Sequence, residues 1–195
     1  MGNYEMAKKV SWDNQFPRSN QAIIEIPGNL LDELEAFTSE NKMPVWDLAK
    51  GGDSTSLIPS ITKWVHLQKS LTETDPGFVC FQCRERNYSD TQLRTLYFLI
   101  ASSFGMLNDR YGAFFDVKDR GLDYTKEAVP VSKTKASTGF HTDSTAKAYS
   151  PDIVGLLCLQ PGRKGGESLL VNGADVYCWM HDKQPMYLPF LEEPI

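Results

Sequence analysis

The residues most able to do chemistry are His141 and Asp143, which are separated by Thr142. On an extended strand, side chains two residues apart point to the same side, so the imidazole and the carboxylate would face one point while Thr142 faces away. An imidazole nitrogen and a carboxylate oxygen are two of the three ligands in the facial triad of non-haem Fe(II) oxygenases. The pair therefore predicts a metal site. The same spacing also suits a buried histidine that is hydrogen-bonded to a neighbouring carboxylate without any metal.

The sequence around this pair makes the pattern more specific than an isolated H-x-D. Phe140 precedes the pair, an apolar run follows at residues 152–159, and residues 165–168 read Gly-Gly-Glu-Ser. These features, in this order, resemble the TauD/TfdA-like family of Fe(II)/2-oxoglutarate-dependent oxygenases, which is related to clavaminate synthase. Residues from 77 onward also look like the N-terminal half of that family, so the resemblance extends from residue 77 to about residue 182.

The resemblance implies a dioxygenase that uses Fe(II) as cofactor and 2-oxoglutarate as cosubstrate. His141 and Asp143 would bind the iron, and Ser168 would donate a hydrogen bond to 2-oxoglutarate. A turn followed by a strand would also explain Ser168 without any ligand. The carboxylate of Asp143 favours hydroxylation over halogenation, because the related halogenases carry a small residue at that position. By analogy with related enzymes, the expected substrate is a small polar or amino-acid-like molecule.

The same resemblance places a second histidine and a 2-oxoglutarate-binding arginine several strands beyond the H-x-D pair. After Asp143 the only histidine is His181, and its surroundings predict a short helix instead of a metal-binding strand. We therefore expect the C-terminal strands to be missing from these 195 residues. A C-terminal continuation, a companion chain or a homo-oligomer would then supply the third iron ligand and the arginine. The alternative function is a catalytically incomplete domain, or one half of a two-chain enzyme, that acts as a binding or structural module.

Helices are predicted in the first half of the chain. Asn29 is a candidate N-cap for a helix with apolar residues at helical spacing, and a second helix is predicted over residues 61–71, with His66 on its surface. Ser89 and Gln92 form a capping-box pattern for a third helix, which ends at the glycine after Phe104.

Short strands are predicted in the remaining segments. Besides the H-x-D segment, they cover residues 78–82, 113–117, 128–131, 153–159 and 168–171. Helices followed by short strands indicate an α+β fold, and the resemblance implies a double-stranded β-helix (jelly-roll) with flanking helices, incomplete in this chain. We expect a single catalytic domain over residues 1–195, with a helical and strand part to about residue 110 and the first jelly-roll strands from about 111 to 195.

The composition narrows the class of partner. The chain is 41% hydrophobic and 23% charged with a formal net charge of −5, which suits a domain with a hydrophobic core. The sequence has no cluster of lysine and arginine that would predict nucleic-acid binding. It also has no run of about 18 apolar residues that would predict a membrane span. The expected partner is a small-molecule substrate, and an N-terminus without a signal-peptide pattern predicts a cytoplasmic protein. Lys133, Lys135 and Lys147 could meet an anionic substrate or simply lie at the surface.

Overall fold

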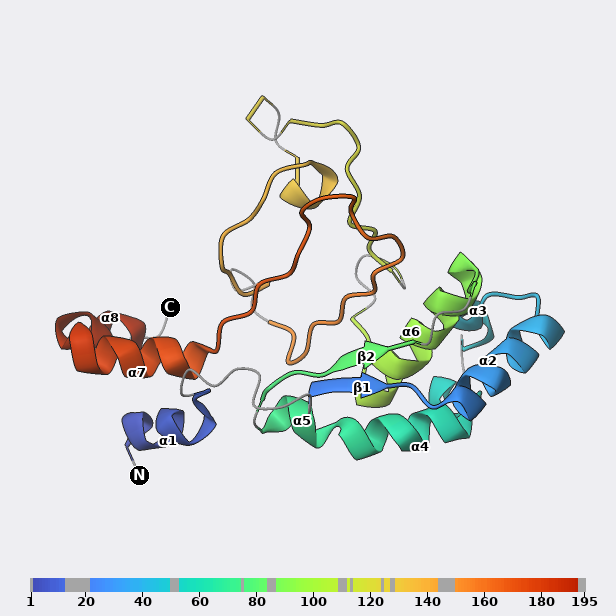
Figure 1. The fold of residues 1–195 in the computed structure, drawn as a ribbon, viewed down its shortest axis with the longest axis horizontal. Coiled ribbons are helices and arrows are strands. Elements are labelled where there is room, and N and C mark those ends of the chain that lie inside the picture. Colours follow the sequence, from blue (N-terminus) through green and yellow to red (C-terminus); the bar gives the residue numbers. More distant parts are fainter. Residues whose placement is uncertain are drawn as a thin grey trace. The chain divides into compact units, whose positions relative to one another are not determined.

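The computed structural model describes most of the chain, and the described residues group into two compact units. The described residues are 2–12, 22–49, 53–74, 76–83, 87–108, 112, 114–123, 125–126, 129–143 and 150–192. Unit 1 comprises Met1–Gly105 and Leu157–Ile195, and unit 2 comprises Met106–Leu156. Figure 1 shows the elements of both units coloured along the sequence.

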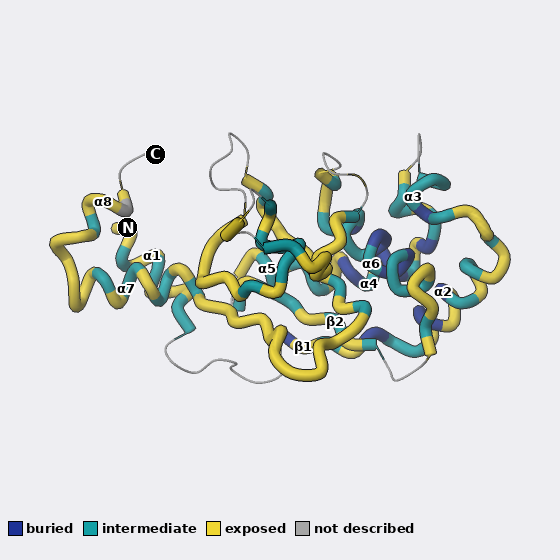
Figure 2. The backbone as a smooth tube through the Cα atoms, turned by 90° about the horizontal axis from the view of Figure 1, so that it is seen from above, coloured by how far each residue is buried: buried dark blue, intermediate teal, exposed yellow. Residues whose placement is uncertain are grey.

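The hydrophobic core lies in unit 1 between three helices. These are α2 (Gly28–Glu40), α4 (Pro59–Gln68) and α6 (Asp90–Phe104). Leu34 and Leu99 are completely buried, and Figure 2 shows the buried positions concentrated on these helices. Apolar side chains three and four residues apart lie on one face of a helix, so each helix covers the core with a stripe of its own sequence.

Short elements connect the core helices. They are α3 (Val45–Leu48), the 3₁₀ helix η2 (Ser54–Ser56) and α5 (Ser70–Glu73). Strands β1 (Ile23–Glu25) and β2 (Cys80–Gln82) pair in parallel, with Ile24 opposite Phe81. Because parallel strands need a long crossover, helices α2 to α5 form the connection between them.

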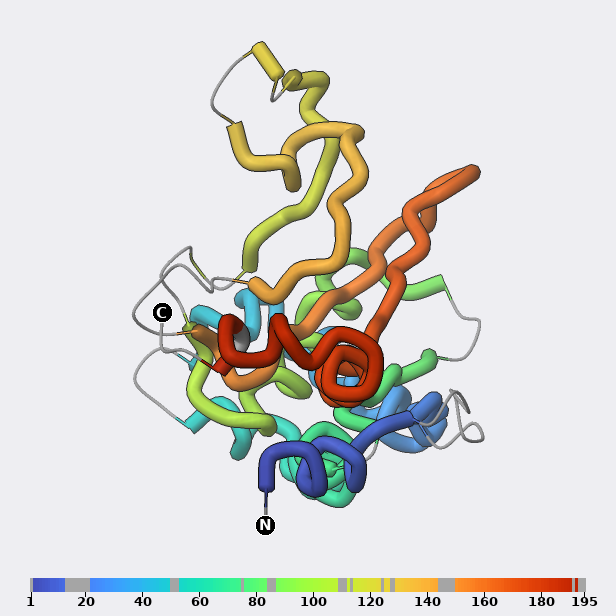
Figure 3. Tube along the Cα trace, turned by 90° about the vertical axis from the view of Figure 1, so that its left-hand side faces the viewer, coloured from blue at the N-terminus to red at the C-terminus, as the bar shows by residue number. Residues whose placement is uncertain are grey.

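The remaining helices of unit 1 come from distant parts of the sequence. Helix α1 (Asn3–Val10) lies beside α7 (Gly173–Lys183), as Figures 1 and 3 show. The 3₁₀ helix η4 (Pro185–Tyr187) and α8 (Leu188–Glu192) follow α7. No helix in the described part of the chain is long and apolar enough to cross a membrane.

Unit 2 is built mainly from irregular backbone. Its helical element in the described ranges is the 3₁₀ helix η3 (Val131–Lys133). Two backbone hydrogen bonds join the segment before η3 to η3 itself, from Lys118 N to Ser132 O (3.1 Å) and from Arg120 N to Lys133 O (2.9 Å). Residues 118–120 therefore lie beside η3.

The predicted helices are present, with changes at their ends. The capping box of Ser89 and Gln92 is confirmed at the start of α6. The prediction for Asn29 is wrong, because α2 begins at Gly28 and the carbonyl of Pro27 accepts its first hydrogen bonds. The helix predicted over residues 61–71 is divided into α4 and α5, and α4 begins two residues earlier with proline at its first position, where a missing N–H costs nothing.

The predicted jelly-roll is not confirmed. Among the described residues, β1 and β2 are the only pair of strands, and the segments predicted as strands after residue 112 have no strand pairing. A helix satisfies its own backbone hydrogen bonds, whereas a strand forms only where another strand supplies partners. Without a second sheet above them, apolar side chains in these segments stay in solvent: Leu156 is 76% exposed and Leu169 is 74% exposed.

Candidate metal centre

His141 lies in an irregular segment whose backbone orients its ring. The Nδ1–H group of His141 donates a hydrogen bond to the carbonyl oxygen of Gly139, at 2.8 Å. A carbonyl oxygen can only accept, so this contact places the proton on Nδ1 and leaves the lone pair of a neutral ring on Nε2. Metal-binding histidines commonly make such a second contact to a backbone carbonyl, which fixes the ring for the metal.

Asp143 faces the other nitrogen of this ring, Nε2. Its Oδ1 atom lies 3.4 Å from His141 Nε2, and the two side chains are 55% and 53% exposed. The structure thus brings the two predicted ligands together, but on an irregular, half-exposed segment instead of the expected strand. The two side chains therefore meet without strand geometry, with one ring nitrogen of His141 at Gly139 and the other at Asp143.

The two donor atoms suit a divalent transition metal. Ligand atoms bound at a right angle to one metal at about 2.1 Å lie about 3 Å apart, close to the observed separation. The described ranges contain no group of three His, Cys, Asp or Glu residues that could hold a metal ion. A metal centre at this pair would therefore need at least one further ligand from outside the described residues.

Ser168 belongs to unit 1, whereas His141 and Asp143 belong to unit 2. It is exposed and lies directly beyond a tight turn in which Gly165 and Gly166 have φ angles of 74° and 86°. These positive values strongly favour glycine, which explains the Gly-Gly pair.

The other two histidines make separate contacts in unit 1. His181 lies in α7, as predicted, with its ring stacked on Tyr4 (centroids 3.8 Å apart) and Nδ1 3.0 Å from Asp182 Oδ1. His66 is exposed on α4, and its Nε2 lies 3.0 Å from the carbonyl oxygen of Ser103. Both contacts account for these rings without a metal.

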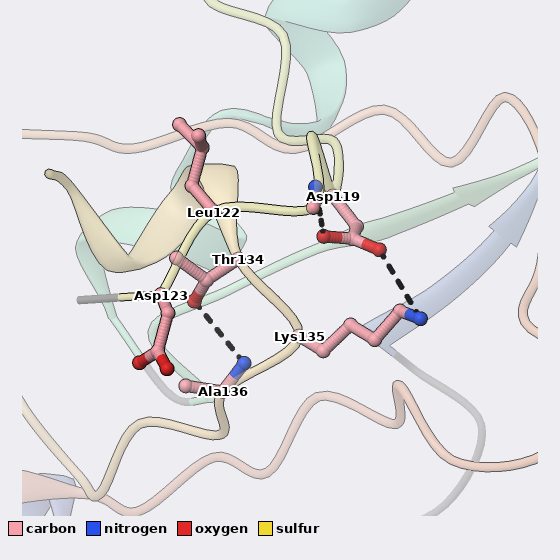
Figure 4. Close-up of a pocket in the computed structure, with 7 residues that line it drawn as sticks. Asp119, Leu122, Asp123, Thr134, Lys135 and Ala136 are labelled. Carbon is pink, nitrogen blue, oxygen red and sulfur yellow. Dashed lines mark hydrogen bonds and ion pairs between the residues drawn. The ribbon is translucent and has the colours of Figure 1, made fainter. Parts of the chain in front are cut away.

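A hollow of about 330 Å³ lies in unit 2, in the loop that precedes the H-x-D pair (Figure 4). Lys135 lines it and forms an ion pair with Asp119 (Nζ to Oδ2, 3.6 Å). Asp123 also lines it, and hydrogen bonds from Thr125, together with Lys126, hold the pKa of its carboxyl below the ordinary value. The hollow is therefore lined by charges of both signs.

Sequence reasoning identified Lys135 but missed the two carboxylates. Asp119 accepts a hydrogen bond from Gly121 N (2.8 Å), and Asp123 accepts one from Thr125 N (3.0 Å). Each is an aspartate bonded to the backbone two residues on, a turn that Asp-x-Gly and Asp-x-Thr patterns favour. Of the other predicted lysines, Lys133 ends η3 and Lys147 lies outside the described residues.

A family model matches the part of the chain that carries these residues. The model of the taurine catabolism dioxygenase TauD, TfdA family matches residues 86–192, more than half of the chain. The match includes His141, Asp143, Ser168 and helix α7. Comparisons with curated proteins and with solved structures find no match.

Proposed function

The chain belongs to the TauD/TfdA family of dioxygenases, and from this premise we propose that it is an Fe(II)/2-oxoglutarate-dependent oxygenase. The proposed reaction is hydroxylation of a small polar or amino-acid-like molecule. His141 and Asp143 would hold the iron, and Ser168 would contact the cosubstrate.

The observation that carries the proposal is the orientation of the His141 ring. Its Nδ1–H is bound to Gly139 O at 2.8 Å, so Nε2 presents a lone pair toward Asp143 Oδ1 at 3.4 Å. A metal cation between these two electron-pair donors would attract both of them. Without a cation, their contact is favourable only if Nε2 also carries a proton. This arrangement is the one that a shared metal would use, and it supports the proposal on that ground.

Each residue has a defined task in the proposed site. His141 supplies a neutral ligand, Asp143 supplies one negative charge against the two positive charges of the metal, and the Gly139 carbonyl keeps the ring in place. When bound, iron and 2-oxoglutarate would supply the chemistry that activates O₂, in which one oxygen atom enters the succinate formed as CO₂ leaves and the other enters the hydroxylated substrate. Ser168 is exposed, so its hydroxyl could donate a hydrogen bond to a cosubstrate oxygen.

The hollow in unit 2 supports a polar substrate. Lys135 is largely exposed and paired at 3.6 Å with Asp119, so a substrate carboxylate could compete for the ammonium group. Exchange of one such exposed ion pair for another costs little, because both are weak in water. The lysine is then the group that would meet an anionic substrate.

A second candidate function is a binding or structural module, either an incomplete domain or one half of a two-chain enzyme. The observation that supports it is that the described residues contain no group of three His, Cys, Asp or Glu side chains that could hold a metal ion. In the oxygenase, the third ligand and the basic residue for 2-oxoglutarate would come from outside the described residues or from another polypeptide.

Anaerobic titration of the chain with Fe(II), followed by 2-oxoglutarate, tests the oxygenase proposal. We expect iron binding in the wild type and its loss in His141→Ala, since one remaining protein ligand holds a labile ferrous ion poorly. His181→Ala is the matched control, because His181 also lies beside an aspartate, at 3.0 Å. Succinate formation from 2-oxoglutarate after O₂ is admitted then separates the enzyme from the binding module. Equal iron affinity in the wild type and His141→Ala would refute the metal site.

A further inference from the structure

The end of helix α1 is bound to the start of helix α7 by residues 10–12, which we call the strap. The carbonyl oxygen of Val10 accepts a hydrogen bond from Asn172 Nδ2 at 2.6 Å. The hydroxyl of Ser11 and the backbone N–H of Trp12 both donate to Asp175 Oδ1, the latter at 3.0 Å. All three strap residues therefore contact the first turn of α7 or its cap.

The two α7 residues that hold the strap also stabilise the start of that helix. Asn172 is the N-cap, and its Oδ1 accepts a hydrogen bond from Ala174 N at 2.8 Å. Asp175 lies in the first turn, where a negative charge is favoured by the helix dipole. The side-chain amide of Asn172 thus joins two structures at once, because its oxygen binds α7 and its nitrogen binds the strap.

Trp12 extends this connection into the rest of unit 1. Its indole Nε1–H donates to the carbonyl oxygen of Pro76 at 2.9 Å, and its ring meets that of Phe78 edge to face, with centroids 5.9 Å apart. Pro76 and Phe78 lie just before strand β2. A hydrogen bond from an indole N–H to a backbone carbonyl is a specific contact, because the ring must lie in one orientation to make it.

The strap therefore contacts the residues at the start of α7, and Ser168 lies four residues before the Asn172 cap. On its other side, Ser168 follows the turn of Gly165 and Gly166, where both residues have positive φ. The intervening segment is exposed and has no strand pairing, so its position depends on its two ends.

We propose that the strap positions the Ser168 segment for 2-oxoglutarate, with Asp175, Asn172 and Trp12 acting as positioning residues. The effect on cosubstrate binding rests on the proposed function, whereas the effect on the order of residues 165–174 does not. The N-terminal residues would thereby control a site to which they contribute no ligand.

The test compares amide hydrogen exchange in the full chain for Asp175→Ala, which loses the acceptor, and Asp175→Asn, which keeps an oxygen at the same place. We expect exchange of the hydrogen-bonded amides of Ala174 and Val176 to rise about tenfold in Asp175→Ala, the factor that corresponds to losing a contact worth about 1.4 kcal/mol, and to return close to the wild-type rate in Asp175→Asn. Asp90→Ala is the matched control, because Asp90 lies in the first turn of α6 and has the same relation to its helix dipole.

The affinity for 2-oxoglutarate is measured on the same proteins in the presence of Fe(II). The proposal predicts a several-fold higher dissociation constant in Asp175→Ala, with unchanged Fe(II) affinity and unchanged exchange in α6. Unchanged exchange of the Ala174 and Val176 amides would overturn the proposal. If Asp175→Ala unfolds the chain, Trp12→Phe decides, since it removes the bond to Pro76 and keeps an aromatic ring against Phe78. The exchange effect could appear in Asp175→Ala while the wild type binds no 2-oxoglutarate. That result would refute the oxygenase proposal and leave the structural role of the strap standing.

Discussion

At the scale of single residues, the orientation of His141 is produced by its neighbours in the chain. Gly139 lies two residues away and supplies the carbonyl that binds Nδ1, and Asp143 lies two residues away on the other side. Five consecutive residues therefore contain both donor atoms and the group that orients one of them. Such a local arrangement can form even where the surrounding backbone is irregular, because it needs no long-range pairing.

Asp143→Asn keeps the shape of the carboxylate and removes its charge. We expect the Fe(II) affinity to fall by more than the roughly 10–100-fold that losing an outer-shell partner of a metal typically costs. Asp152→Asn is the control, since Asp152 is an exposed aspartate in the same region of the sequence. Anaerobic calorimetric titration measures both affinities. An equal affinity in the two variants would show that Asp143 is not a ligand.

At the scale of secondary-structure elements, the sequence predicts helices far better than strands. The Ser89 and Gln92 pattern locates the start of α6, because both partners of the capping box lie within three residues of each other. The apolar segment at residues 153–159 has the composition of a strand, but composition does not identify a partner strand. The H-x-D pair was predictable from spacing, whereas the bond from His141 to Gly139 and the carboxylates of the hollow follow from turns that spacing alone does not reveal.

Ser89→Ala tests the contribution of the capping box to the stability of unit 1. The substitution removes the side-chain acceptor for Gln92 N and should lower the free energy of unfolding by about 1 kcal/mol. Ser39→Ala is the matched control, because Ser39 is exposed on α2. Its hydroxyl donates to the carbonyl oxygen of Glu35, which already belongs to the hydrogen-bonded backbone of that helix. Urea denaturation followed by circular dichroism measures both changes. The prediction fails if the two variants lose the same stability.

At the scale of the whole molecule, the beginning and end of the sequence meet in unit 1. Besides the strap, Tyr4 of α1 stacks on His181, and its hydroxyl donates to Asp182 at 3.2 Å. Asn3 Nδ2 donates to Glu192 Oε1 at 3.2 Å, and the Tyr177 hydroxyl donates to the same carboxylate oxygen. Helix α1 has no buried residue, so these polar and ring contacts, not a hydrophobic core, hold it against α7 and α8.

Acid should therefore release α1 before it unfolds the core helices. The hydrogen bond from Tyr177, and then that from Asn3, hold the pKa of Glu192 below its ordinary value of 4.5. The contact with His181, and a weaker one from Tyr4, hold the pKa of Asp182 below its ordinary value of 3.8. A carboxyl whose pKa is lowered by folding stabilises the folded contact above its ordinary pKa, and this contribution disappears as the pH falls through the lowered value.

We thus expect α1 to stay docked from neutral pH down to about pH 4.5 and to detach at lower pH as the two carboxylates are protonated. NMR spectra of the amides of residues 3–10, recorded during acid titration, measure the detachment, and the amides of α6 report on the core. Glu192→Gln cannot be protonated in this range, so it should weaken the pH dependence and lower the population of docked α1 at neutral pH. If the amides of α1 and α6 change together at one pH, the two ends of the chain are not held by these carboxylates and acid acts on unit 1 as a whole.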